Sequence, residues 1–228
     1  RAIDWLAEPR QRPFFLWVHY YDAHLPYRPP AAFTPVAAKP AGQLNSWNPA
    51  ETRANYLGEV AFADAELGRL LDALGPERMQ RTLVIFTSDH GESLGEHGEK
   101  THGTLAYDAT LRVPLIVWGR PQIEPGVVQD TMRLVDVAPT IIDLVGAEPL
   151  DAVDGRSIRP FLGGTQPFDD RESYFEVNGM RGVVHGRHKL IAGRTPELYD
   201  LQADPGELKD LYQPQDPRVL ELSAILDK

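Results

Sequence analysis

Three things are scarce or missing in this chain, and each excludes a class of protein. It has no cysteine, which rules out disulfides, thiolate metal sites and a cysteine nucleophile within these residues. Basic residues number 23 against 33 acidic ones and form no stripe, so we expect no nucleic-acid partner. No apolar run approaches the roughly 18 residues of a membrane span, so we expect none.

What is present indicates a folded protein with a negative surface. The 228 residues are 42% hydrophobic, enough for a substantial core in one large domain or in a main domain with a small appendage. The formal net charge of −10 is compatible with a bound cation.

The first two thirds of the chain alternate between strand and helix patterns. Continuous aromatic and β-branched runs at 13–21, 82–88 and 112–119 predict buried strands. Apolar residues spaced three and four apart predict a helix from about Ala50 to Leu74 that Gly75-Pro76 stops. A second helix is expected before Gly146, with Asp136 as its cap. This alternation predicts an α/β fold, with helices on a mostly parallel sheet.

The pattern of apolar and polar residues changes after about residue 165. The stretches "RGVVHGRHKLIAG" and "PELYDLQADPGE" predict a hairpin-like antiparallel pair, and "DPRVLELSAILD" predicts a terminal helix. We therefore expect two domains, an α/β part over 1–165 and a small α+β appendage over 166–228. The stretch from Lys39 to Trp47 has no periodicity and is expected to be a loop.

Titratable residues gather where the strand at 82–88 ends. Asp89 and His90 follow it directly, and a carboxylate beside an imidazole makes half of a divalent-cation site. The alternative is that Asp89 caps a turn and His90 is a loop histidine. His24, Lys100 and His102 are expected at the same rim of the sheet, where they suit recognition of an anionic group beside a cation.

Seven blocks in sequence order resemble the sulfatase family of the alkaline phosphatase superfamily. They are "FFLWVHYYDAHLPYRPP", "YLGEVAFADAELGRLLDAL", "TLVIFTSDHGESLGEHGEKTHG", "YDATLRVPLIVWG", "VDVAPTIIDLVG", "DGRSI" and "ELYDLQADPGELKDL". The resemblance implies a three-layer α/β/α fold that hydrolyses sulfate esters or, in close relatives, phosphate and phosphonate esters.

The resemblance also implies roles for single residues. Asp89 and His90 match the two late metal ligands, for calcium or alternatively magnesium or manganese. His24 matches the histidine that contacts the anionic group of the substrate. His102 stands where many members have a lysine with that role, so His102 and Lys100 remain alternatives. Either His24 or His102 would act as the general acid.

Two family blocks have no match here. One is a strand ending in paired aspartates, the other half of the metal site. The other is a C-x-P-x-R or S-x-P-x-R block, whose first residue becomes a formylglycine nucleophile. We expect both upstream of Arg1, so that the chain resembles the carboxy-terminal half to two thirds of a sulfatase. We expect Glu92, Glu96 and Glu99 to form a solvated acidic loop, and His97 to be structural.

Three functions remain open from the sequence. The first is a fragment of a hydrolase of small-molecule or carbohydrate sulfate esters. The second is a phosphodiesterase or phosphonate monoester hydrolase of the same superfamily, and the third a catalytically dead module that binds an anion or a partner. An unpaired strand edge would favour a homo-oligomer. The resemblance slightly favours a periplasmic or secreted location.

Overall fold

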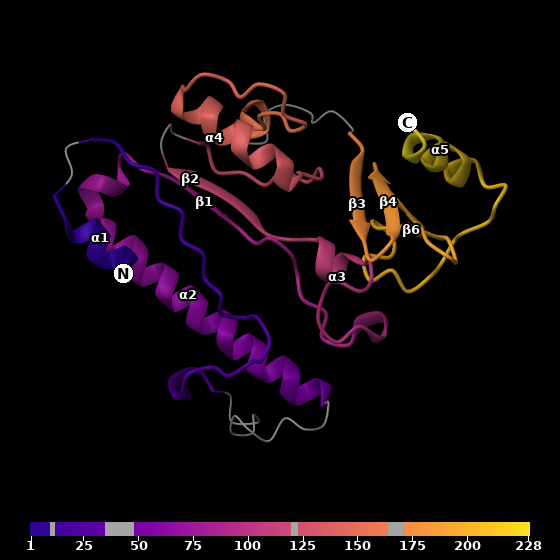
Figure 1. The fold of residues 1–228 in the computed structure, drawn as a ribbon, viewed down its shortest axis with the longest axis horizontal. Helices are drawn as coiled ribbons and strands as arrows, with labels where there is room; N and C mark the ends of the chain where they lie inside the picture. Colours follow the sequence, from indigo (N-terminus) through magenta and orange to yellow (C-terminus); the bar gives the residue numbers. More distant parts are fainter. Residues whose placement is uncertain (10–11, 35–47, 120–122, 164–170) are drawn as a thin grey trace. The chain divides into compact units, whose positions relative to one another are not determined.

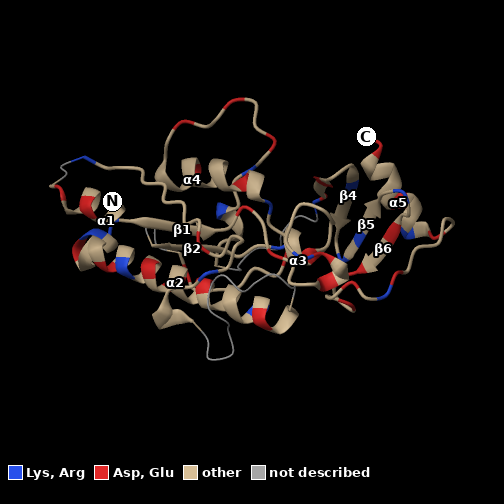
Figure 2. Ribbon diagram, turned by 60° about the horizontal axis from the view of Figure 1, so that its bottom comes forward, with Lys and Arg blue, Asp and Glu red and all other residues tan. Residues whose placement is uncertain are grey.

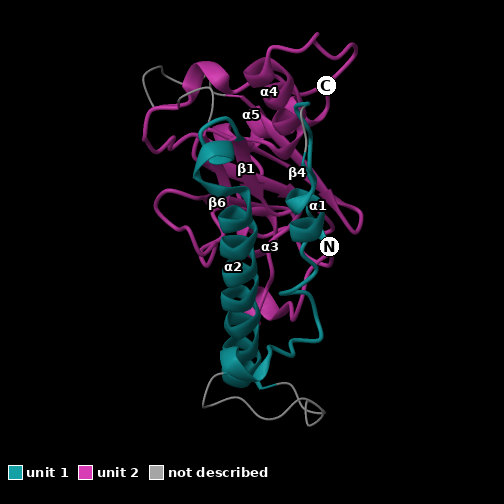
Figure 3. Cartoon of the chain, turned by 90° about the vertical axis from the view of Figure 1, so that its left-hand side faces the viewer, with its two compact units in different colours: residues 1–82 teal, residues 83–228 magenta. Residues whose placement is uncertain are grey.

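The computed structural model describes residues 1–228 except 10–11, 35–47, 120–122 and 164–170. The loop expected from Lys39 to Trp47 and the expected boundary after residue 165 lie outside the described residues. The chain divides into two compact units, 1–82 and 83–228, which Figure 3 colours separately. In the described ranges, no helix is long and apolar enough to cross a membrane.

The long helix α2, Pro49–Met79, dominates the first unit (Figure 1). Asn48 caps it by accepting a hydrogen bond from the Glu51 amide, and Pro49 occupies its first position. Gly75 has a left-handed φ of 70° and is followed by Pro76, so the regular helix is interrupted where the sequence predicted its end. The remaining turn continues to Met79.

The segment 13–21 is extended but is not a strand of any sheet in the described part of the chain, which corrects our expectation. Leu16, Val18 and Tyr20 pack with the short helix α1, Ala2–Ala7, and with the second half of α2. The alternate side chains Phe15 and Trp17 are exposed. The segment has the period of a strand but no described neighbour that pairs with its backbone.

The second unit begins with a two-stranded ribbon of β1, Leu83–Thr87, and β2, Leu115–Gly119. The strands are antiparallel, with Ile85 opposite Val117. The mostly parallel, three-layer arrangement is therefore not confirmed, since every described pairing is antiparallel. Parallel neighbours need a crossover, usually a helix, whereas the link from β1 to β2 contains the 3-10 turn η2, Glu96–Gly98, and the short helix α3, Asp108–Leu111.

Two further 3-10 turns, η3 at Leu134–Asp136 and η4 at Arg159–Phe161, flank the helix α4, Val137–Val145. Gly146 ends α4 with a φ of 69°, as the sequence predicted. Asp136 stands at the predicted cap position, but its side chain makes no cap hydrogen bond. It is fully buried and instead binds arginines, Arg171 at 2.6 Å among them.

The carboxy-terminal part contains a four-stranded antiparallel sheet in the order β3-β4-β5-β6. Its strands are Ser173–Val177, Met180–His185, His188–Ala192 and Glu197–Asp200. The expected antiparallel pairing is present, with an additional hairpin inside the first predicted stretch. The predicted terminal helix is α5, Pro217–Leu226 (Figure 1).

The two faces of this sheet pack against different partners. On one face Val183, Leu190 and Leu198 form a core with Val219 and Leu222 of α5. Burying one such aliphatic side chain contributes about 1.5–3 kcal/mol, so this core holds α5 to the sheet. On the other face Ile191 and Tyr199 pack against Ala106, next to α3. Figure 2 shows basic and acidic positions interspersed along the drawn chain.

Candidate functional site

Asp89 and His90 lie just beyond the carboxyl end of β1. Ser88 precedes them, and its hydroxyl donates to the His90 carbonyl at 2.6 Å. The Asp89 Oδ1 accepts from the His90 amide at 3.0 Å, so the turn-capping alternative describes one of its two oxygens. The other oxygen, Oδ2, is 3.8 Å from His90 Nε2. The two side chains thus present a carboxylate oxygen and a ring nitrogen side by side.

The tautomer of His90 follows from its backbone contact. Its Nδ1 is 2.8 Å from the Gly91 carbonyl, which can only accept, so Nδ1 carries the hydrogen. In the neutral ring, Nε2 is then the acceptor on the side of Asp89. A metal-binding histidine is held in this way, with the second ring nitrogen donating to a carbonyl or carboxylate.

The donor pair fits part of a cation shell. Asp89 is 70% exposed and His90 39%, so an ion could reach both side chains. Calcium takes about six to eight oxygen-rich ligands, and two side chains supply only a fraction of that shell. Within the ranges that the structure describes, no group of three or more His, Cys, Asp or Glu residues could hold a metal ion. The pair by itself therefore offers two ligands for a cation.

Gly91 fixes the chain directly after the pair. Its amide donates to the carbonyl of Thr110, a residue of α3, at 2.7 Å. A Cβ added at Gly91 would lie 2.4 Å from the Ala109 carbonyl oxygen, closer than real contacts allow. Glycine is thus required for the backbone to pass this close.

His102 lies against the Asp-His pair. Its ring stacks on the His90 ring with centroids 4.0 Å apart. Its Nδ1 is 3.2 Å from Oε1 of Glu92, whose side chain is 4% exposed. Because a carboxylate only accepts, Nδ1 carries a hydrogen and Nε2 lies on the other side of the ring. Three predicted site residues, Asp89, His90 and His102, are thus together.

The acidic loop is only partly solvated: Glu96 is exposed, as we expected, whereas Glu92 is half-buried and Glu99 is buried. Glu99 is 6% exposed and accepts from the Thr104 and Leu105 amides at 2.7 and 3.1 Å. Glu96 accepts from the Leu94 amide at 2.6 Å, and Glu92 orients His102. The charge pattern does not show this, because each carboxylate is satisfied by groups that only the path of the loop brings near.

Lys100 and His97 belong to the same loop but occupy different places. Lys100 is exposed, two positions before His102. The ring of His97 stacks on Tyr107 with centroids 3.6 Å apart, and its Nε2 is 3.1 Å from the Gly206 carbonyl oxygen. The structural role expected for His97 agrees with these contacts.

His24 belongs to the first unit, so its distance from Asp89 stays a prediction. Its Nδ1 is 2.7 Å from the Leu25 carbonyl, and its ring stacks on Tyr21 at 4.6 Å. As in His90, the carbonyl fixes the hydrogen on Nδ1.

Glu59 of α2 holds the loop that carries His24, a role that the sequence did not reveal. Its carboxylate accepts from the Ala23 amide at 3.1 Å and from the Arg28 amide. Burial raises the pKa of Glu59, and the charge of Asp22 adds to this, while the two amide hydrogen bonds act against it. The sequence shows only that Glu59 follows Gly58, a glycine that the structure requires because its Cβ would lie 2.5 Å from the Phe33 carbonyl oxygen.

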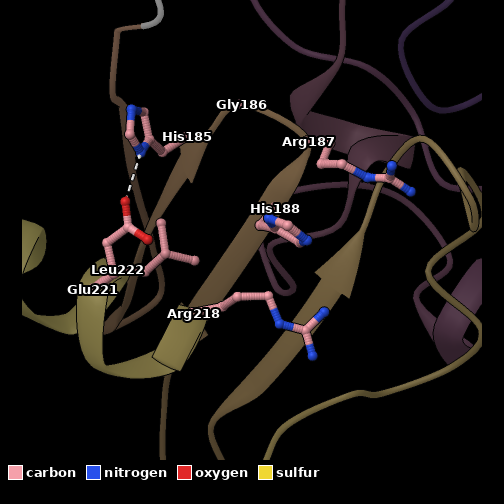
Figure 4. A pocket seen from close by; sticks show the side chains of 7 residues that line it. All are labelled: His185, Gly186, Arg187, His188, Arg218, Glu221 and Leu222. Carbon is pink, nitrogen blue, oxygen red and sulfur yellow. Dashed lines mark ion pairs between the residues drawn. The ribbon is translucent and has the colours of Figure 1, made fainter. Parts of the chain in front are cut away.

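A separate hollow of about 230 Å³ lies at the β4–β5 turn (Figure 4). It contains none of the predicted site residues. Its arginines are paired, Arg187 with Asp200 and Arg218 with Asp216. Burial lowers the pKa of His188, so this histidine adds little positive charge at neutral pH. The hollow is therefore close to electrically neutral and offers no convergent charge for a ligand.

Two family models match the chain. The model "Sulfatase" matches residues 1–147, and the model "N-sulphoglucosamine sulphohydrolase, C-terminal" matches residues 95–228. Together they cover the chain from end to end and overlap across the loop that carries His97 and His102.

Curated relatives agree with these models. The multifunctional alkaline phosphatase superfamily protein PehA of Trinickia caryophylli is 32% identical over 92% of this chain and 45% of its own length. The uncharacterized sulfatase YidJ of Escherichia coli is 29% identical over 92% of this chain and 50% of its own length. The chain thus spans about half the length of these relatives.

Solved structures agree as well. BT4656, in complex with its substrate D-glucosamine-2-N,6-O-disulfate, has a TM-score of 0.68 at 30% identity, over 78% of this chain and 40% of that one. The phosphonate monoester hydrolase SpPMH from Silicibacter pomeroyi has a TM-score of 0.65 at 31% identity, over the same 78 and 40%. The chain belongs to the sulfatase family of the alkaline phosphatase superfamily.

Proposed function

We propose that this chain carries one side of the active site of a metal-dependent sulfate ester hydrolase. The observation that carries the proposal is the contact of His102 with the Asp89-His90 pair, with Glu92 behind it. The relative BT4656 binds a sulfated glucosamine, which supports a small-molecule or carbohydrate sulfate ester as the substrate.

In this proposal Asp89 and His90 supply two ligands to a divalent cation, with calcium as the first candidate and magnesium or manganese as alternatives. The positive charge of the cation would offset the negative charge of the ester's anionic group. The Gly91 carbonyl keeps the His90 Nε2 lone pair directed to that position.

His102 is proposed to bind the ester group and to move a proton. When doubly protonated, it donates from Nδ1 to Glu92 and from Nε2 to an ester oxygen. The same Nε2 proton can pass to the leaving oxygen, which makes His102 a candidate general acid. His24 is the alternative, and its Nδ1 is fixed in the same manner. Lys100 is proposed as a further cation for the anionic group.

The chain does not supply every part of the reaction. It has no cysteine, so a formylglycine derived from cysteine must come from residues outside it. The paired aspartates of the metal site are likewise proposed to lie outside it. We therefore propose that residues 1–228 by themselves are inactive.

A phosphonate monoester hydrolase or phosphodiesterase is the second candidate. It is favoured by the similarity to SpPMH, which matches this chain as well as BT4656 does. The side chains described above suit either ester, since both groups are anionic and tetrahedral.

The test is an assay of the protein encoded by the gene that contains this chain, after sequencing upstream of the Arg1 codon. Matched para-nitrophenyl sulfate and phosphonate esters identify the preferred group. We expect His102→Asn to lower kcat by about 10²–10⁴-fold, the range for loss of a general acid. His185→Asn, at the hollow in Figure 4, is the matched control and should leave kcat unchanged. Equal effects of the two substitutions, or no turnover of either ester by the wild type, would overturn the proposal.

A further inference from the structure

The carboxy-terminal sheet supplies a buried lysine to the segment next to the candidate site. Lys189 of β5 points to the face opposite α5, because Leu190 beside it packs on that helix. Its side chain is 0% exposed. Charged lysines are rarely buried completely without partners, so the contacts of this one define what it does.

Lys189 is paired with two carboxylates. Its Nζ is 2.9 Å from Asp108 Oδ1, at the start of α3, and 2.7 Å from Glu207 Oε1. Glu207 is 2% exposed, and its second oxygen accepts from the Asp108 amide at 2.6 Å. We call Lys189, Asp108 and Glu207 the buried triad. It attaches the first residue of α3 to β5 and to the turn that follows β6.

A second attachment lies about ten residues earlier in the loop. His97 stacks on Tyr107, and its Nε2 meets the carbonyl oxygen of Gly206, the residue before Glu207. The Tyr107 hydroxyl donates to Glu197 of β6 at 2.7 Å. Both ends of the loop from His97 to Asp108 are therefore fastened to residues 197–207.

Both attachment points have unusual backbone conformations. His97 and Glu207 each have a φ of 53°, in the left-handed region that residues other than glycine rarely adopt. Such conformations persist only where the surrounding structure determines them. Here the stacking on Tyr107 holds His97 in this conformation, and the buried ion pair with Lys189 holds Glu207.

Between its two ends the loop carries Lys100 and His102. Glu99 binds the Thr104 and Leu105 amides, and Ser93 donates from its amide to the Thr101 carbonyl at 2.9 Å. The loop therefore has few ways to rearrange internally, and a shift at its ends would move His102 relative to His90.

We propose that Lys189 and Glu207 are positioning residues for the anion-binding side of the site, through which the carboxy-terminal sheet sets the place of His102. The inference rests on the proposed function, because it takes His102 as the group that meets the ester. Neither residue is assigned contact with substrate, and both act through Asp108 and the fastened loop.

The test uses the whole chain, with ¹⁵N-labelled histidine side chains followed by NMR while sodium sulfate is added. The variant is Glu207→Gln, which keeps the shape and removes one charge of the triad. The control is Arg187→Gln, which breaks the pair between Arg187 in the β4–β5 turn and Asp200 at the end of β6. Circular dichroism checks that both variants are folded.

For the wild type and Arg187→Gln we expect an upfield-shifted His97, from stacking on Tyr107, and a sulfate response at His102. For Glu207→Gln we expect the His97 shift to collapse and the sulfate concentration for half response at His102 to rise at least fivefold. A purely structural role would lower the melting temperature and leave both signals of the folded protein in place. That outcome would overturn the inference.

Two further arms keep the test decisive. If Glu207→Gln does not fold, the double variant Lys189→Met with Glu207→Gln removes the two fully buried charges together and leaves only the Asp108 carboxylate, which is 19% exposed. The same criteria then apply. If wild-type His102 does not respond to sulfate, the proposed anion-binding role of His102 fails, and the positioning claim is judged by whether the His102 and His97 resonances move together in the variant. Unmoved His102 resonances would overturn it.

Discussion

Replacing Asp136 with asparagine removes a completely buried negative charge at the start of α4. The carboxylate has an exposed fraction of 0% and accepts two hydrogen bonds from Arg171, at 2.6 and 3.3 Å, and one from the Arg156 amide at 2.9 Å. Arg133 donates three further bonds, from Nη2 at 3.3 Å, from Nε at 3.5 Å and from its backbone amide at 3.4 Å. In asparagine, an NH2 group replaces one of these acceptor oxygens, so a donor would face the guanidinium groups, which are also donors.

The expected cost is about 3–5 kcal/mol in the free energy of unfolding, the range for removing one partner of a buried ion pair. In a unit of this size that lowers the melting temperature by roughly 6–20 °C. Asp143→Asn is the matched control on the same helix. Asp143 also pairs with an arginine, Arg159 at 2.9 Å, but is 38% exposed, so solvent screening limits the cost to below about 1 kcal/mol.

The pH dependence gives a second criterion. Burial opposes ionisation of Asp136, but the hydrogen bonds from Arg171, the Arg156 amide and Arg133 outweigh it and lower its pKa below 3.8. A lowered carboxyl pKa gives stability that is fully present above the unfolded value and is lost as the pH falls through the folded value. Urea unfolding should show a constant difference between wild type and Asp136→Asn near neutral pH, shrinking only below about pH 4. A difference below about 1 kcal/mol at pH 7, or one no larger than that of Asp143→Asn, would refute the reasoning.

Four further predictions concern the site and its surroundings. The chain alone should hydrolyse neither sulfate nor phosphonate esters, and turnover that Asp89→Ala abolishes would reveal a nucleophile we have missed. Millimolar calcium or magnesium should stabilise the chain by less than about 1 kcal/mol, since two ligands bind weakly, and submicromolar binding by calorimetry would contradict this. Glu59→Ala should speed amide hydrogen exchange at Ala23 and Arg28, and Glu59→Gln should do so less because it keeps one acceptor; unchanged rates would exclude the proposed tether. The exposed Ile116 and Trp118 of β2 should promote self-association, and a concentration-independent monomer in sedimentation would argue against it.

Local signals in the sequence were sufficient for the interruption of α2, the end of α4 and the start of α5, but they did not indicate the short helices α1 and α3. Gly75-Pro76 interrupts α2 because glycine tolerates the left-handed φ and proline cannot continue the hydrogen bonding of the preceding turn. Gly146 ends α4 for the first of these reasons. The terminal helix α5 begins as its Asp-Pro pair predicts, with the Asp216 side chain accepting from the Arg218 amide.

Strand direction and partners could not be predicted in the same way. The apolar runs of β1 and β2 indicate burial, but they do not say which neighbour pairs with them or in which direction. The run at 13–21 shows the difference, because it is as apolar as β1 and is nevertheless not paired in the described residues. A run of apolar and β-branched residues predicts an extended backbone. Which strand it pairs with depends on segments far away in the sequence.

The site was partly predictable for a similar reason. Position after a strand or in the loop beyond it was enough to single out Asp89, His90 and His102, and the family resemblance gave each of them a role. The contact of His102 with Glu92 spans ten positions of an irregular loop, which no periodicity describes. The buried triad joins residues 81 and 99 positions apart, so neither composition nor spacing indicated it.

The close passage at Gly91 predicts an unusual pattern of mutational tolerance. In a saturation library over positions 89 to 91, most changes at Asp89 and His90 should remove activity from the complete enzyme while the protein still accumulates, since both side chains face solvent. Changes at Gly91 should reduce the amount of soluble protein first, because any side chain meets the Ala109 carbonyl oxygen. Substitutions at three adjacent positions would thus be harmful for two different reasons. Comparing protein abundance with turnover for each variant would separate the two residues needed for activity from the glycine needed for close packing of the backbone.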